Sequence, residues 1–354
     1  MLLVVFGAGA SYDSVPHLPP GGILPAVRPA MVDNHPENTR PPLASQLFDT
    51  RPLFVEAMRR FRECLEVIPL LRKPDVLVER ELAELREQAK QFPRVHQELA
   101  AILFYLHFAI WESQRFWFDC HQGINNYVTF VRELERWRFE SNENICFVTF
   151  NYDTMLEQAM EQVLHIAFTD FSQYVSQNNY ILVKLHGSMN WGRELDGIRP
   201  ASPQELIDAA ANLRISDRFR FVARHPMILD DGSIAYPALS IPLEKKDEFS
   251  CPESHVDSLI QILAKMTKII SIGWRAMEED FREMLRLSLP PAQEVLIVSG
   301  DERGGNETLE NLKRGQNAFL SETIVPTYGF TGLINNLGYL NNFLRRPNPR
   351  RNRP

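Results

Sequence analysis

"VVFGAGASYD", residues 4–13, places two glycines and a serine directly behind an apolar run. This run, residues 2–6, is continuously apolar and rich in valine, which is typical of a parallel strand buried on both faces. Glycines behind such a strand let the backbone turn tightly and approach a ligand such as a pyrophosphate, to which the turn offers amide donors and one hydroxyl. The turn comprises Gly7, Ala8, Gly9, Ala10 and Ser11. It is shorter than the full G-x-G-x-x-G pattern, so simple turn chemistry stays open as an alternative.

The composition is that of a globular protein without a generally basic surface. Its 354 residues are 44% hydrophobic and 23% charged, enough for one large domain or two modest ones. A net charge of -7 argues against binding of duplex nucleic acid by the whole body. Residues 345–354, "RRPNPRRNRP", predict a basic disordered tail that either aids solubility or contacts a nucleic acid or a partner.

Signals for secretion, membrane insertion and disulfide bonding are weak. The apolar run at the N-terminus is too short for a secretory signal, and no stretch approaches the roughly 18 apolar residues of a membrane span. We therefore expect a cytoplasmic protein without membrane contact. The cysteines stand far apart and form no C-x-x-C pair, so we expect neither a disulfide framework nor a zinc site. They are Cys64, Cys120, Cys146 and Cys251.

Strand-like and helical stretches alternate through most of the chain, and this alternation predicts parallel strands joined by helical crossovers. The fold class that follows is α/β, with a doubly wound, mostly parallel sheet of the Rossmann type. Strands are expected at residues 2–6, 145–150, 180–185, 218–223, 268–273, 294–300 and 322–326. Helices are expected at residues 153–164, 203–212, 253–266, 278–288, 305–314 and 329–344.

An all-helical insert at residues 53–140 interrupts this alternation. The α/β domain would then comprise residues 1–52 and 141–344, with residues 14–52 as a long proline-rich loop. Apolar residues at spacings of three and four predict four helices in the insert. They span residues 54–68, 76–92, 95–118 and 125–139. The third is apolar nearly all round, so we expect it to be buried among the others or at a subunit contact.

Polar residues follow two further strands, and in an open α/β sheet ligands bind beyond the carboxyl ends of the strands. "TFNYD" supplies Thr149, Asn151 and Asp153. An asparagine can donate and accept at once, which suits it to grip ribose hydroxyls or a water molecule. Asp153 also stands where it would cap the following helix, and capping is the favoured reading of that carboxylate.

"KLHGSMNW" places His186 directly behind the next strand, where an imidazole can act as a general base or orient a sugar hydroxyl. Gly187 would again permit close approach of the backbone. "SIGWRAMEED" puts Gly273 at another turn after a strand, and the acidic residues 278–280 behind it either partner a helix dipole or contact a ribose. Ser299, at the end of the next strand, is a candidate edge for an adenosine.

The order of "GAGAS", "TFNYD", "LHGS" and "SIGW" resembles the sirtuin superfamily, with its GAG[IA]S turn, T-x-N-x-D segment, His-Gly pair and late glycine turn. The resemblance covers residues 1–13 and 145–300. The segments "RPPLASQLF" and "HGSMNW" are more similar to the bacterial sirtuin-like proteins of phage defence than to the protein deacylases. Two departures agree with that choice, because the deacylase zinc ribbon of four cysteines is missing and Phe150 replaces the glutamine before the catalytic asparagine.

The resemblance implies an enzyme that cleaves NAD, its substrate, into nicotinamide and ADP-ribose. The bond breaks through an oxocarbenium-like state, which needs a dry pocket, fixed polar groups and a placed water. Asn151 would orient the ribose or the water, and His186 would bind or deprotonate a ribose hydroxyl. Asp153 would position the loop that carries Asn151, and residues 14–52 would close over the nicotinamide. The turn at Gly7–Ser11 would hold the pyrophosphate.

The same resemblance implies an NAD hydrolase that acts in abortive infection, as a homo-oligomer or with a partner such as a HerA-family ATPase. Two other functions stay open: an NAD-dependent protein deacylase, and a non-catalytic scaffold that binds NAD or ADP-ribose within a nuclease complex. The sequence does not separate hydrolysis of the ADP-ribosyl product from its cyclisation, since both share the first step.

Overall fold

The computed structural model describes most of the chain. The described residues are 1–14, 40–72, 78–121, 125–240, 249–290, 293–314, 320–325 and 329–346. Most of the predicted loop at 14–52 and all but the first two residues of the predicted tail at 345–354 lie outside these ranges.

The central element is a parallel sheet of six strands in the order β3-β2-β1-β7-β8-β9. Its strands are β1 (Leu2–Phe6), β2 (Ile145–Thr149), β3 (Tyr180–Lys184), β7 (Lys268–Ile272), β8 (Gln293–Val298) and β9 (Leu320–Val325). Strand order reverses between β1 and β7, so the crevice where ligands bind in such sheets lies between the turns that follow these two strands. The predicted doubly wound α/β fold is confirmed.

Helices accompany the strands of this sheet as crossovers or pack beside them. They are α1 (Ala8–Asp13), α7 (Asn126–Ser141), α8 (Met155–Leu164), α10 (Glu253–Leu263), α11 (Glu279–Ser288), α12 (Glu302–Lys313), α13 (Gly329–Asn335) and α14 (Gly338–Arg345). α7 contacts both α8 and α13, and α13 contacts α1. Helix α7 therefore belongs to the layer that covers the turn after β1.

A second, antiparallel sheet follows β3, and the sequence did not predict it. It consists of β4 (Gly187–Leu195), β5 (Ile215–Phe221) and β6 (Tyr236–Leu239) in the order β5-β4-β6. The strand expected at 218–223 was wrongly assigned to the parallel sheet, since it is the end of β5. β4 was missed because its partly polar sequence lacks the apolar run of a buried strand. β6 was missed because it has only 4 residues. A short helix, α9 (Pro203–Asp208), and the turns η3 (Phe171–Tyr174) and η4 (Ala210–Asn212) complete this region.

The helices before α7 pack around one long buried helix. They are α3 (Pro52–Arg60), α4 (Ile68–Leu71), α5 (Val78–Ala89) and α6 (Pro93–His121), with the turns η1 (Ala44–Gln46) and η2 (Arg62–Glu66). α6 is buried from Ala100 to Ile110, as its all-round apolar pattern predicted. The single helix expected at 54–68 is instead broken, because Phe61 leaves helical geometry with φ -116 and ψ 74. No helix among the described residues is both long and apolar enough to span a membrane.

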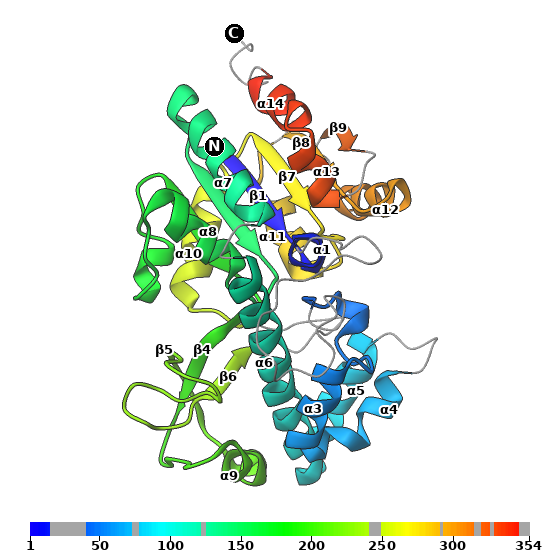
Figure 1. Cartoon of the computed structure of the whole chain (residues 1–354), viewed down its shortest axis with the longest axis vertical. Helices are drawn as coiled ribbons and strands as arrows, with labels where there is room; N and C mark the ends of the chain where they lie inside the picture. The colour runs from blue at the N-terminus through cyan, green and yellow to red at the C-terminus, as the bar shows by residue number, and fades with distance from the viewer. Residues whose placement is uncertain are drawn as a thin grey trace.

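The apolar core forms two clusters that divide the chain in an unexpected way. The first contains the parallel sheet together with residues of α7 from Tyr127 to Leu134. The second joins α3–α6 to side chains of the antiparallel sheet and α9, such as Met189, Leu206 and Leu239. Figure 1 shows this second body below the large sheet, with α6 between the antiparallel sheet and α3–α5. β1 runs from the N-terminus down to α1, so the carboxyl edge of the large sheet faces that body (Figure 1).

Candidate functional site

The turns after β1 and β7 touch backbone to backbone at the point where strand order reverses. Gly7 N donates a hydrogen bond to Ile272 O at 3.0 Å, and Gly9 N donates one to Gly273 O at 3.2 Å. Gly273 has φ +60, and a Cβ built on it would lie 2.3 Å from Ala10 N. Glycine is needed here because the two turns approach so closely. Part of the room that the sequence reserved for a ligand is thus filled by the Gly273 turn itself.

The turns at the outer side of this crevice are partly exposed. They include Ala8 and Gly9 and, behind β8, Ser299. Gly300 is exposed, and among the described residues no atom lies within 4 Å of a Cβ built on it. Behind this turn, Asp301 caps α12. The start of α13 contacts the predicted adenosine edge, because Gly329 N donates to Ser299 O at 3.0 Å.

Ser11 and Asn151 meet across the carboxyl edge of the sheet. Asn151 Nδ2 donates to Ser11 Oγ at 2.8 Å, although the two residues come from the first helix and from the loop after β2. The backbone N of Asn151 donates to Thr149 Oγ1 at 3.0 Å, which fixes the start of that loop. Ser11 and Asn151 are both buried, with 2% and 7% of their surface exposed. The structure thus brings together the first two predicted segments.

A residue that the sequence did not single out completes this contact. Tyr127, from the first turn of α7, places its hydroxyl 2.9 Å from Ser11 Oγ and 3.2 Å from Asn151 Nδ2. Its ring packs against Phe6 and Phe330, with centroids 5.1 and 5.3 Å apart. Burial raises the pKa of Tyr127 well above its usual range, so the phenol stays neutral and keeps its proton. In the sequence Tyr127 is one more aromatic of an amphipathic helix, and no local pattern marks it.

His186 lies beside the same loop. Its ring meets the edge of Phe150 at a centroid distance of 4.7 Å, and Phe150 stacks on Trp274 at 5.5 Å. His186 therefore flanks the residue directly before Asn151, and only 7% of it is exposed. Gly187 has φ +79, and a Cβ there would lie 1.8 Å from Ala238 O. The close approach that Gly187 permits is to the β6 backbone.

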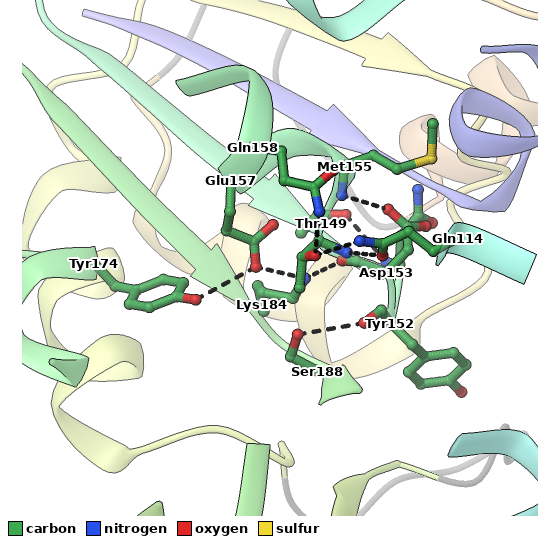
Figure 2. A network of polar contacts seen from close by, with 12 residues as sticks. Gln114, Thr149, Tyr152, Asp153, Met155, Glu157, Gln158, Tyr174, Lys184 and Ser188 are labelled. Atoms are coloured by element: carbon green, nitrogen blue, oxygen red, sulfur yellow. Dashed lines mark hydrogen bonds and ion pairs between the residues drawn. The ribbon is translucent and has the colours of Figure 1, made fainter. Parts of the chain in front are cut away.

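A buried ionic network anchors the same loop at Asp153 (Figure 2). Lys184, at the end of β3, donates to the carbonyl oxygen of Asp153 and pairs with Glu157 Oε1 at 2.9 Å. Tyr174 donates to the same Glu157 oxygen at 3.3 Å. Burial raises the pKa of Glu157, and the Lys184 charge opposes that rise. Asp153 Oδ1 accepts from Met155 N at 3.1 Å, so the carboxylate binds the first N–H of α8 from the position before the N-cap residue Thr154.

Helix α6 binds the loop at Thr154 through Gln114. Gln114 accepts a hydrogen bond from Thr154 N and donates one to Thr154 Oγ1, both at 2.6 Å and both buried (Figure 2). Two successive helices thus hold the segment 151–154: α6 through Gln114 and α7 through Tyr127.

Three cysteines, Cys64, Cys146 and Cys251, are free and buried at separate places. Within the described ranges, no three His, Cys, Asp or Glu side chains gather in a group that could hold a metal ion.

Comparisons with known proteins give structural neighbours only. No family model and no curated protein matches the chain. A Sir2 homolog in complex with NAD aligns at 13% identity and a TM-score of 0.34 over 89% of this chain and 88% of that chain. A complex of Sir2 with a p53 peptide and NAD+ aligns at 13% identity and 0.38, over 97% and 93%. Such low TM-scores do not by themselves assign a family or an activity to this chain.

Proposed function

We propose that the chain binds NAD at the carboxyl edge of its parallel sheet and hydrolyses the bond between nicotinamide and ribose. The observation that carries the proposal is the 2.8 Å contact of Asn151 with Ser11 beside the point of strand reversal, with His186 on the flank of the same loop. Dinucleotides bind in such sheets across this point.

The geometry fits an extended ligand with unlike ends. An adenosine would lie beside the exposed Gly300, with the pyrophosphate next to the turn at Ala8 and Gly9. The nicotinamide ribose would then reach Asn151 and His186, both of which are nearly buried. Loss of nicotinamide leaves positive charge on the ribose, and fixed dipoles in a water-poor pocket stabilise that charge better than solvent does.

Asn151 and His186 carry the chemistry in this proposal. Asn151 orients a ribose hydroxyl or the attacking water, and His186 accepts or holds a ribose hydroxyl proton. Asp153 supports the loop through its bond to Met155 N, and Lys184 holds the carbonyl of the same residue.

The motif order that resembles the sirtuin-like proteins of phage defence sets the biological context of the proposal. In that context the chain depletes NAD in an infected bacterial cell, as a homo-oligomer or under the control of a partner ATPase of the HerA type. The basic segment 345–354 is then a contact for a subunit or a nucleic acid.

The test measures NAD in bacteria that express the wild type, Asn151→Ala or His186→Ala during phage challenge. NAD should fall, and ADP-ribose and nicotinamide accumulate, only with the wild type. The control is His96→Ala, a partly exposed histidine in the first turn of α6, far along that helix from Gln114. Calorimetry on purified protein measures NAD binding separately.

The outcomes distinguish the proposed hydrolase from a scaffold and from a deacylase. NAD bound but never consumed in a protected culture identifies a scaffold, and NAD consumed only with an acylated peptide identifies a deacylase. No binding of NAD by the wild type would refute the proposal.

A further inference from the structure

Tyr127, Ser11 and Asn151 form a closed ring of three hydrogen bonds whose hydrogens can be counted. Asn151 Nδ2 only donates, and it contacts Ser11 Oγ at 2.8 Å and Tyr127 Oη at 3.2 Å, so neither contact uses a hydroxyl hydrogen. The third contact, 2.9 Å between the two hydroxyls, uses one hydroxyl hydrogen. One hydroxyl hydrogen is left over.

The chemistry of the two hydroxyls decides which hydrogen that is. A phenol is the stronger acid and the better donor, while an aliphatic alcohol is the better acceptor. The Tyr127 phenol stays protonated in its buried place, so it donates to Ser11 and accepts from Asn151. Ser11 then keeps its own hydrogen for an acceptor outside the ring.

We infer that Tyr127 is a positioning residue that sets which atoms Ser11 and Asn151 present to the ligand. Asn151 turns its amide nitrogen toward Ser11 and Tyr127, so its carbonyl oxygen is the atom offered to a hydroxyl or water of the substrate. Ser11 offers a donor to an oxygen of the ligand. The inference deepens the proposed NAD hydrolase, on which its kinetic consequences depend.

The first turn of α7 is built to hold the Tyr127 hydroxyl in place. Asn125 caps the helix by accepting from Val128 N at 3.2 Å. Asn126 Nδ2 donates to Asp13 O at 3.0 Å and to Thr331 Oγ1 at 2.9 Å, which ties α7 to the end of α1 and to α13. The phenol ring is wedged between aromatic rings, and only 1% of the residue is exposed. The hydroxyl therefore has one reachable position.

The decisive test needs neither NAD nor turnover. Protein labelled with ¹⁵N at asparagine reports the side-chain amide hydrogens of Asn151, whose signals are assigned by their loss in Asn151→Ala. The side-chain amide should exchange its hydrogens slowly with solvent in the wild type and at least about tenfold faster in Tyr127→Phe, which removes one of the two acceptors of Nδ2. The matched control is Tyr105→Phe, a buried tyrosine of α6 whose hydroxyl donates to Leu47 O at 2.5 Å. In Tyr105→Phe, exchange of the Asn151 side-chain amide hydrogens should equal that of the wild type.

The kinetic test asks whether the hydroxyl acts on the reacting centre. Tyr127→Phe should lower kcat for NAD cleavage about tenfold and change KM little, because the loop still binds substrate but holds Asn151 less firmly. Tyr105→Phe should lose a similar amount of stability and keep kcat.

Exchange at Asn151 that is the same in Tyr127→Phe and the wild type would overturn the inference, as would equal loss of kcat in both tyrosine variants. A wild type that cleaves no NAD would refute the proposed function, and the exchange experiment would still decide the role of Tyr127.

Discussion

Replacement of Lys184 by methionine should remove the contacts that hold the loop with Asn151 and lower the free energy of unfolding. Lys184 is fully buried, pairs with Glu157 at 2.9 Å and donates to the carbonyl of Asp153. Methionine fills a similar volume, so the change removes the charge and the donor without opening a large cavity. It leaves Glu157, which is 5% exposed, as a buried carboxylate without its counter-charge.

The cost follows from that unpaired charge. Removal of one partner of a buried ion pair costs about 3–5 kcal/mol. Unfolding entropies near 2.1 cal/mol/K per residue give a chain of 354 residues about 0.7 kcal/mol/K, so a loss of about 4 kcal/mol lowers Tm by roughly 5 °C in a single cooperative transition. The double variant Lys184→Met/Glu157→Gln removes both charges and should regain most of the loss.

The dependence of the stability loss on pH tests whether the unpaired charge of Glu157 causes it. Lys184 is the largest influence that opposes the effect of burial, and a backbone hydrogen bond is the smaller one that remains, so the pKa of Glu157 rises further without Lys184. A folded pKa above the unfolded value gives stability that is present below the unfolded pKa, near 4.5, and is lost as pH rises through the folded pKa. Lys184→Met should therefore lose more stability relative to the wild type at pH 8 than at pH 5.

Urea unfolding at both pH values, followed by tryptophan fluorescence, measures these differences. The double variant should show no such difference between the two pH values. A loss below about 1 kcal/mol at pH 8, or an equal loss at pH 5 and pH 8, would show that the Lys184–Glu157 pair does not stabilise this loop.

Three further changes test other parts of the structure. Gly273→Ala should cost at least about 3 kcal/mol and abolish NAD binding, because its φ is +60 and the new Cβ meets backbone; denaturation and calorimetry measure the two effects. Gly300→Ala is the control for stability only, since no atom of the described residues lies within 4 Å of its new Cβ and its unfolding should not change. His107 is buried with its pKa lowered to about 3 by burial and then by a neighbouring histidine, so it favours folding above its unfolded pKa of 6.5. Between pH 7 and pH 5 it should remove about 2 kcal/mol of stability. The slope should shrink by that amount in His107→Gln, where His225, whose pKa is lowered to about 4 by burial, still contributes its own part. A slope as steep as that of the wild type would contradict this. Gln114→Ala loses two buried hydrogen bonds to Thr154 and should lower both the unfolding free energy, by about 2 kcal/mol, and kcat for NAD.

The parts of the fold that the sequence predicted are those with a local signal. The continuous apolar run at residues 2–6 and the glycine at 273 mark strand ends directly, and both lie where strand order reverses. β4 has no such signal. It forms a strand by pairing with β5 and β6, which come later in the chain, so its own residues do not mark it. Register within a sheet of this kind is set by neighbours far along the chain, which a local pattern does not contain.

The candidate site shows the same division. Asn151 and His186 were found because polar residues behind buried strands are conspicuous, and the sheet then places them at one edge. Tyr127 and Gln114 were missed because they lie on helices whose apolar and polar pattern is ordinary. Only the packing of α6 and α7 on the loop reveals that they hold it. Residues that position a catalytic group are, for this reason, harder to predict from sequence than the group itself.

The glycines of the first turn acquire a second explanation from the structure. The sequence alone left a ligand and simple turn chemistry open as the reason for them, and in the structure the nearest atoms to a Cβ on Gly7 or Gly9 belong to the Gly273 turn. Side chains at these positions would push apart β1 and β7, the two strands between which the order reverses. The fold therefore requires glycine here before any ligand binds. The proposed ligand would contribute to the choice only through the exposed side of the turn at Ala8 and Gly9, so a strand-ending Gly-Ala-Gly could serve the proposed dinucleotide site and a strand contact at once.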